Sequence, residues 1–255
     1  MRVECRRRGL AAALLGVALL GSWLPAARAA EGPRLLEFRT ADCLACVAMA
    51  DALAAEPAWA ALTARAPVQT LAPDDPEAML RHTDECRAHK VPFAADISQT
   101  LASLDGESIR NLLVGAKYSF LNEYEMALAM KKTGWGISDF LDNVEICITT
   151  LGARGARIES ASFPTIEVGV AKERAKVDPT GIGDAFRAGF ISALAWGAEL
   201  ERCAQVGSLV ATYCLETQGG QEYRFTREQF LERFSESYGN STRQDLEQLI
   251  PRSFS

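Results

Sequence analysis

The 255-residue sequence lacks an excess of basic residues, since 27 Lys and Arg stand against 33 Asp and Glu, a formal net charge of −6. Contacts to a nucleic-acid backbone need a basic field, so this composition argues against a nucleic-acid-binding protein. Internal repeats and low-complexity linkers are also absent from the sequence. Because 48% of the residues are hydrophobic, the chain can bury a core and is not a disordered protein.

A long membrane-spanning run is lacking as well. The apolar run at residues 9–24 has roughly sixteen residues, fewer than the about twenty that a transmembrane helix needs. It follows a basic block, Arg2 and Arg6 to Arg8, and precedes the small-residue pattern A-R-A at residues 27–29. These features predict a secretory signal peptide over residues 1–29 and no membrane span.

The seven cysteines are odd in number and scattered, so most of them are expected to be small core residues. Cys43 and Cys46 differ, because they form a C-x-x-C pair between a predicted strand at 35–39 and a helical pattern at 46–55. Helix-terminal amides would stabilise the thiolate of Cys43. The arrangement resembles the opening of a thioredoxin-like domain and favours, as one alternative, an exported thiol-disulfide protein.

From Leu71 onward the sequence alternates between helical and extended patterns, which is typical of a parallel α/β sheet. The predicted helices are 75–88, 106–114, 123–131, 183–197 and 199–217. The predicted strands are 91–96, 117–121, 145–151, 156–159 and 166–170.

The run D-P-T-G-I-G-D at residues 178–184 stands at the entrance of a predicted helix. Glycines there let backbone N–H groups converge, and the helix dipole adds to an anion site. A carboxylate such as Asp184 would repel that anion, so its placement is explained if it accepts a proton from an attacking hydroxyl. As a bare pattern, the same run also fits a loop with an N-capping aspartate.

Extended to Phe190, this run reads D-P-T-G-I-G-D-A-F-R-A-G-F and resembles the second signature of the PfkB family of kinases. The resemblance implies an α/β, ribokinase-like parallel-sheet sandwich and ATP-dependent phosphorylation of a sugar or nucleoside hydroxyl, with ATP and Mg²⁺. It also implies that Asp184 is the catalytic base and that the amides of Gly181, Ile182 and Gly183 form the anion hole. Ile182 stands where the family usually has a small residue, which puts packing rather than mechanism in doubt.

Two segments that precede this run in the sequence stand in the order that the family has. The run N-E-Y-E, Asn122 to Glu125, resembles the N-x-x-E motif, which implies that Asn122 binds nucleotide and that Glu125 acts on magnesium through water. The run T-L-G-A-R-G at 150–155 resembles the strand-turn-strand element that lines the nucleotide, which implies binding roles for Thr150, Gly152 and Gly155. As bare patterns the two would be an acidic helix start and a hairpin turn.

Runs at 73–79, 93–99 and 221–223 resemble the actinobacterial-type adenosine kinase branch, which favours adenosine as the small-molecule acceptor. Nothing before Leu71 resembles the sugar-binding aspartate, the Gly-Gly hinge or the β lid of the family. We therefore expect a signal peptide at 1–29, a thioredoxin-like fragment at 30–70 and a PfkB-type catalytic part at 71–255 that lacks its N-terminal half and lid.

Such a catalytic part would leave sheet surface that a partner chain or another segment must cover. A noncatalytic remnant that still binds nucleotide is a third reading. The expected localisation is divided, because the signal peptide indicates export whereas a kinase needs the ATP of the cytoplasm.

Overall fold

The computed structural model describes residues 35–38, 68–71 and 76–251, with side chains from residue 79 onward. The chain divides into two compact units, residues 1–78 and 79–255. In the first unit, strands β1 (Leu35–Phe38) and β2 (Val68–Leu71) pair in parallel, which confirms the strand predicted at 35–39. The predicted signal peptide, the helix at 46–55, and Cys43 and Cys46 lie outside the described residues.

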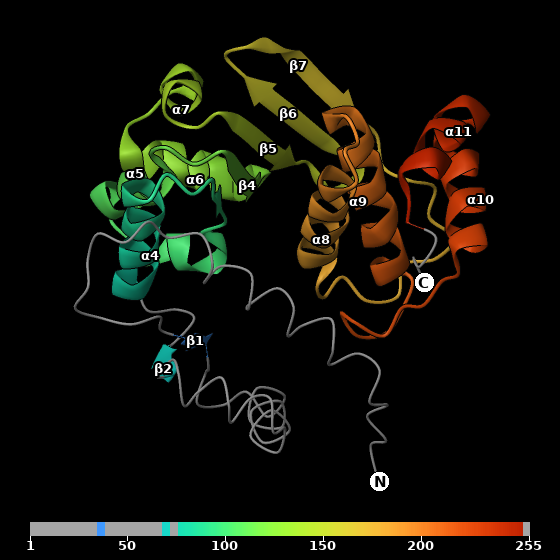
Figure 1. Cartoon of the computed structure of the whole chain (residues 1–255), viewed down its shortest axis with the longest axis horizontal. Coiled ribbons are helices and arrows are strands. Elements are labelled where there is room, and N and C mark those ends of the chain that lie inside the picture. The colour runs from blue at the N-terminus through green and yellow to red at the C-terminus, as the bar shows by residue number, and fades with distance from the viewer. Residues whose placement is uncertain (1–34, 39–67, 72–75, 252–255) are drawn as a thin grey trace, which may run out of the picture. The chain divides into compact units, whose positions relative to one another are not determined.

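The second unit contains a sheet in the order β3-β4-β5-β6-β7 among its described strands. Its strands are β3 (Ala94–Ala95), β4 (Tyr118–Asn122), β5 (Ile146–Thr150), β6 (Ala156–Ser160) and β7 (Phe163–Val168). The first three are parallel, as predicted, whereas β6 and β7 are antiparallel to their neighbours. The turns before β6 and β7 are too short for a parallel crossover, so the chain reverses at each of them (Figure 1).

The described helices include all those predicted from 75 onward, to within two residues at each end. The helices are α4 (Pro76–Ala88), α5 (Gly106–Leu113), α6 (Glu123–Thr133), α7 (Ile137–Asn143), α8 (Ile182–Ala195), α9 (Leu200–Leu215), α10 (Arg227–Tyr238) and α11 (Asn240–Leu249), with 3₁₀ turns η2 (Ser98–Ala102) and η3 (Gly152–Arg154). Helices α7, α10 and α11 were not predicted. None of the described helices has the length and apolarity that crossing a bilayer requires.

Alternation along the strands places helices on both faces of the sheet. On one face, Phe120, Ile146 and Ile148 belong to the core that includes α8 to α11. On the other face, Leu121 and Cys147 belong to the core that includes α5 to α7. Helices α8 and α9 run side by side in Figure 1, and their close approach is a glycine contact: a Cβ on Gly189 would lie 2.9 Å from the Cα of Gly207.

Two strand predictions need correction. The buried strand predicted at 91–96 pairs only at Ala94–Ala95, and the side chain of Val91 is 39% exposed. This strand lies at the edge of the described sheet, and Pro92 has no N–H with which to extend a ladder. The run predicted at 166–170 is β7, which starts earlier, at Phe163, because it pairs with β6 from the turn onward, and it ends at Val168.

Candidate functional site

Residues 178–184 form the loop that leads into α8. Gly181 is the N-cap of this helix and has a φ of +80°. A Cβ at this position would lie 2.9 Å from the Cα of Gly220, so both the left-handed backbone and the close approach require glycine. Ile182 begins the helix, and its side chain packs against the core beneath.

The amides at this helix entrance are the groups that a bound anion would use. The N–H of Ile182 donates a long hydrogen bond of 3.4 Å to the carbonyl of Pro179. Within the described part of the chain, the N–H groups of Gly181 and Gly183 have no acceptor. Unpaired amides at the positive end of a 14-residue helix attract a phosphoryl group.

Asp184 lies in the first turn of α8, and its side chain is 83% exposed. Its Oδ1 is 3.3 Å from Nη2 of Arg187. The Arg187 guanidinium also pairs through Nε with Asp96, which directly follows β3, and Nη2 donates to Oγ of Ser98 at 2.9 Å. Arg187 therefore ties the first turn of α8 to the chain after β3 while leaving Asp184 accessible.

Asp178 closes the other end of this loop. Its carboxylate accepts hydrogen bonds from the N–H of Thr180 at 2.9 Å, the side-chain amide of Gln218 at 2.8 Å and the N–H of Gly219 at 2.9 Å. The bonds from Thr180, followed by that from Gly219, hold the pKa of Asp178 below its ordinary value. Asp178 thus fastens the loop to the turn that follows α9.

Asn122 and Glu125 form a capping box at the start of α6. The side chain of Asn122 accepts from the N–H of Glu125 at 2.7 Å, and Oε2 of Glu125 accepts from the N–H of Asn122 at 2.8 Å. This reciprocal pairing orients the Glu125 carboxylate over the end of β4. Among the described residues, its Oε1 has no partner. Residues 35–38, 68–71 and 76–251 contain no cluster of three or more His, Cys, Asp or Glu side chains suited to a metal.

Thr150 is the register partner of Asn122 at the carboxyl ends of β5 and β4. The turn after it contains two glycines with positive φ. A Cβ on Gly152 would meet no atom within 4 Å, whereas one on Gly155 would lie 1.9 Å from the carbonyl oxygen of Val168. Gly152 therefore borders open space, while the close approach at Gly155 is to the protein's own backbone.

The structure brings these residues together in two groups at the carboxyl ends of the parallel strands, where open α/β sheets bind ligands. Asn122, Glu125 and Thr150 form one group, and Asp184 belongs to the other. In the part of the chain that is described, no hydrogen bond or ion pair joins them. Sequence reasoning missed Arg187 and Asp96 as an interacting pair. The only signal was opposite charge within two runs already noted as motifs, and charge alone does not reveal pairing.

A model of the pfkB family carbohydrate kinases matches residues 43–225, more than half of the chain. The chain belongs to the PfkB family. The match begins inside the segment predicted to be thioredoxin-like, so the likeness of this PfkB family chain extends further toward the N-terminus than its motifs indicated.

The relatives of this PfkB family chain include nucleoside kinases. The nucleoside kinase of Methanocaldococcus jannaschii is 30% identical over 163 residues, which cover 64% of this chain and 53% of that enzyme. The solved structure of Burkholderia thailandensis nucleoside kinase in complex with ADP-inosine is 32% identical, has a TM-score of 0.61, and matches 64% of this chain and 51% of that one.

Arabidopsis thaliana ribokinase complexed with ribose and ATP is 19% identical, with a TM-score of 0.55 over 66% of this chain and 55% of that one. At this identity the match concerns the fold alone, and it confirms the ribokinase-like α/β architecture implied by the sequence. The chain spans about half the length of the relatives that it matches.

Proposed function

We propose that residues 71–255 bind ATP and supply the anion site and the catalytic base for transfer of its terminal phosphoryl group to a hydroxyl of a nucleoside. The observation that carries this proposal is the entrance of α8, where the amides of Gly181 and Gly183 lack an acceptor among the described residues and Asp184 is 83% exposed beside them. An anion site next to an accessible carboxylate is the arrangement that phosphoryl transfer to a hydroxyl needs.

The residues divide the work as follows. Asp184 accepts the proton of the acceptor hydroxyl as that oxygen attacks. The amides of Gly181, Ile182 and Gly183 stabilise charge on the phosphoryl oxygens, and the weak bond from Ile182 to Pro179 is readily exchanged for a stronger one. Asn122, Thr150 and Gly152 line the nucleotide, since Asn122 and Thr150 are register partners at the carboxyl ends of β4 and β5 and Gly152 borders open space in the turn that follows.

Magnesium, when bound with ATP, neutralises charge on the phosphates. Mg²⁺ keeps several waters and takes one or two protein carboxylates. Glu125 fits this role through water, because Oε2 is fixed by the N–H of Asn122 and Oε1 has no partner among the described residues.

Adenosine is the acceptor that the sequence favours, and a nucleoside acceptor is further supported by the two nucleoside kinase relatives. We also propose that groups orienting the acceptor lie outside residues 71–255. Loss of such orientation forfeits on the order of 7–11 kcal/mol of barrier lowering, so nucleotide binding should survive better than chemistry.

The test is transfer of radiolabelled phosphate from ATP to adenosine, inosine or ribose. The chain itself should bind ATP weakly and transfer almost no phosphate. A graft that replaces residues 1–70 with the N-terminal half of an adenosine kinase should transfer it to adenosine. Robust phosphate transfer by the ungrafted chain would refute the proposal that the groups orienting the acceptor lie outside residues 71–255. A graft that binds ATP but transfers nothing would favour the noncatalytic remnant.

The thiol-disulfide alternative and the signal peptide stay predictions. Burial raises the pKa of the Cys147 and Cys214 thiols, and it raises the pKa of Cys203 to about 12. If Cys43 is a redox nucleophile, alkylation at neutral pH should reach it well before those three. Uniformly slow alkylation would exclude this role.

A further inference from the structure

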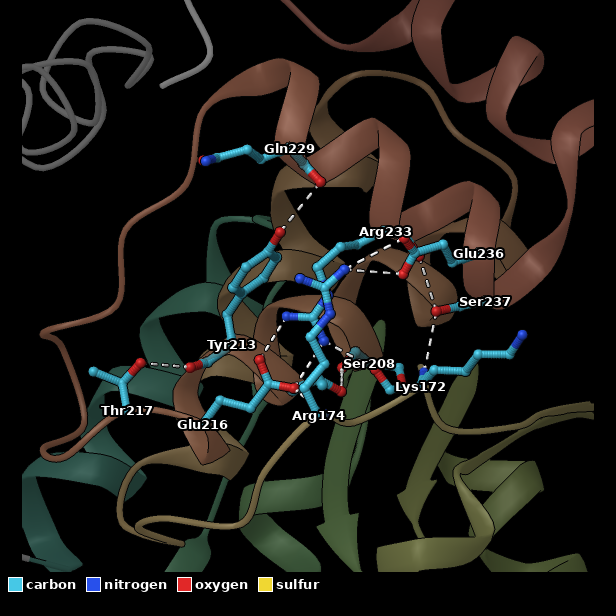
Figure 2. Close-up of polar contacts among 11 residues, drawn as sticks. Lys172, Arg174, Ser208, Tyr213, Glu216, Thr217, Gln229, Arg233, Glu236 and Ser237 are labelled. Atoms are coloured by element: carbon cyan, nitrogen blue, oxygen red, sulfur yellow. Dashed lines mark hydrogen bonds and ion pairs between the residues drawn. The ribbon is translucent and has the colours of Figure 1, made fainter.

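Residues 169–178, here called the connecting segment, lead from β7 to the loop before α8 without forming a helix or strand. Helices α9 and α10 hold its backbone at several points (Figure 2). The hydrogen bonds run from Tyr238 Oη to the carbonyl of Gly169 (3.0 Å), from Ala171 N to Ser208 Oγ (2.9 Å), from Lys172 N to Ser237 Oγ (3.1 Å), and from Val177 N and Asp178 N to the carbonyl of Leu215 (2.9 and 3.1 Å).

A buried ion pair lies at the centre of these contacts. The side chains of Arg233 and Glu216 are 6% and 13% exposed, and two hydrogen bonds of 2.5 and 2.8 Å join them. The guanidinium lies 4.6 Å from the centre of the Tyr213 ring. Both partners also bind the connecting segment: Arg233 Nη2 donates to the carbonyl of Lys172 at 2.9 Å, and Glu216 Oε1 accepts from the N–H of Arg174 at 2.6 Å.

Stability alone is a weak explanation for this pair. Glu216 is the C-cap of α9, where the helix dipole disfavours a carboxylate. Burial alone would raise its pKa, but the hydrogen bonds from Arg233 and from the Arg174 amide outweigh burial and lower the pKa. A buried ion pair is often no more stabilising than apolar side chains of the same volume. What the Arg233–Glu216 pair does that apolar side chains could not do is fix the backbone path of the connecting segment through hydrogen bonds.

We propose that Arg233 and Glu216 are positioning residues that set where the Gly181–Gly183 amides and Asp184 lie. This role rests on the proposed function of that loop. Lys172 and Arg174 lie on the segment that leads to Asp178, and Glu216 directly follows Leu215, whose carbonyl accepts from the N–H groups of Val177 and Asp178. The pair therefore acts on the loop through both the connecting segment and the end of α9. Phosphoryl transfer is sensitive to such shifts, because a displacement of about 1 Å can cost about a hundredfold in rate.

The test uses the full chain, with three variants, one control variant and three measurements: the melting temperature, the affinity for ATP, and hydrogen exchange of the hydrogen-bonded amides within residues 178–187, such as those of Asp178, Thr180 and Ala185. Arg233→Met leaves Glu216 buried without its partner, so the melting temperature and the ATP affinity should fall and amide exchange should become faster. The double variant Arg233→Met/Glu216→Met replaces the pair with apolar side chains and should regain most of the melting temperature. Its ATP affinity should stay roughly tenfold or more below the parent's, because a charge-assisted hydrogen bond to the phosphates is misaligned. Exchange over 178–187 should stay fast.

Arg233→Lys provides the conservative comparison. It keeps the charge but cannot hold the Glu216 carboxylate and the Lys172 carbonyl in one fork, so its melting temperature and its affinity for ATP should both lie between those of the parent and of Arg233→Met. Glu236→Gln is the matched control, since it removes an exposed ion pair with Arg174 (52% and 62% exposed) from the same network and should change nothing measurable.

If the double variant regains the parent's ATP affinity and slow amide exchange as well as its melting temperature, the proposal is overturned. If the parent chain fails to bind ATP, the proposed function fails, and exchange alone then decides the positioning role. Fast exchange over 178–187 in a stable double variant supports it, and slow exchange refutes it.

Discussion

Two clusters of arginine and carboxylate differ in exposure: one lies at the entrance of α8, and the other holds the connecting segment that leads to it. In the outer cluster, the side chains of Arg187, Asp96 and Asp184 are 24%, 31% and 83% exposed. In the inner cluster, those of Arg233 and Glu216 are 6% and 13% exposed. A ligand can reach the carboxylate of Asp184, whereas Glu216 is reached by the protein's own backbone. The outer cluster therefore suits chemistry and the inner cluster suits positioning.

Asp184→Asn gives the largest expected effect on activity. It removes the proton acceptor and keeps the size of the side chain, so phosphate transfer by the graft should fall by about a hundredfold or more. Affinity for ATP should stay within a few-fold, and the melting temperature should not change, because the side chain is largely exposed. Equal turnover by the variant and its parent would remove Asp184 from the role of base.

Arg187→Gln should lower phosphate transfer less, by about tenfold, because Asp184 remains but loses the contact that orients it. Arg187→Lys should keep part of the activity, since one charged group can still pair with Asp96 or Asp184. Steady-state kinetics of the graft separate the two variants. If Arg187→Gln transfers phosphate at the parent rate, the outer cluster is not a functional unit.

The turn between β5 and β6 shows the same contrast between open and enclosed positions. Gly155→Ala combines a φ of +95° with a Cβ 1.9 Å from a carbonyl oxygen and should cost about 1–3 kcal/mol more stability than Gly152→Ala, because backbone must move to make room. Gly152→Ala faces open space at a φ of +59° and should cost at most about 1–2 kcal/mol, the strain of the left-handed region. Denaturant unfolding of both variants measures the difference, and equal losses would show that the turn is not packed as described.

The smallest expected effect concerns pH. Because the pKa of Glu216 is lowered in the folded protein, its contribution is complete above the unfolded value of about 4.3 and is lost as pH falls through the folded value. Glu216→Gln should therefore lower the melting temperature at neutral pH, and this difference should shrink below about pH 4. A difference that stays constant down to pH 3 would show that the charge of Glu216 contributes nothing.

The predictable parts of the fold are those with local signals. Helices α6 and α8 follow the N-caps Asn122 and Gly181, and both were predicted because polar or glycine residues stand directly before a helical pattern. Helix α9 was predicted from its long run of small and apolar residues. The predicted strand at 91–96 was too long because an alanine-rich apolar run does not reveal that it lies at an edge. Helices α10 and α11 were missed because polar residues outnumber apolar ones in both.

The site was predictable only where one motif contains it. Asp184 and its glycines are adjacent in sequence, whereas Arg187 meets Ser98 across 89 positions and Arg233 meets Lys172 across 61. Such pairs depend on which helix lies beside which strand, and no local pattern encodes that choice. Gly155 shows a further limit, since the same residue type serves ligand approach and backbone packing.

The central claim is that the amides at the entrance of α8 bind the phosphates of ATP. An amide-resolved NMR titration of the full chain with ATP and magnesium, compared with adenosine and magnesium, tests it most directly. The account predicts shifts of the Gly181, Ile182 and Gly183 N–H signals with ATP that adenosine does not cause. Saturable ATP binding that leaves these three signals unchanged would contradict it.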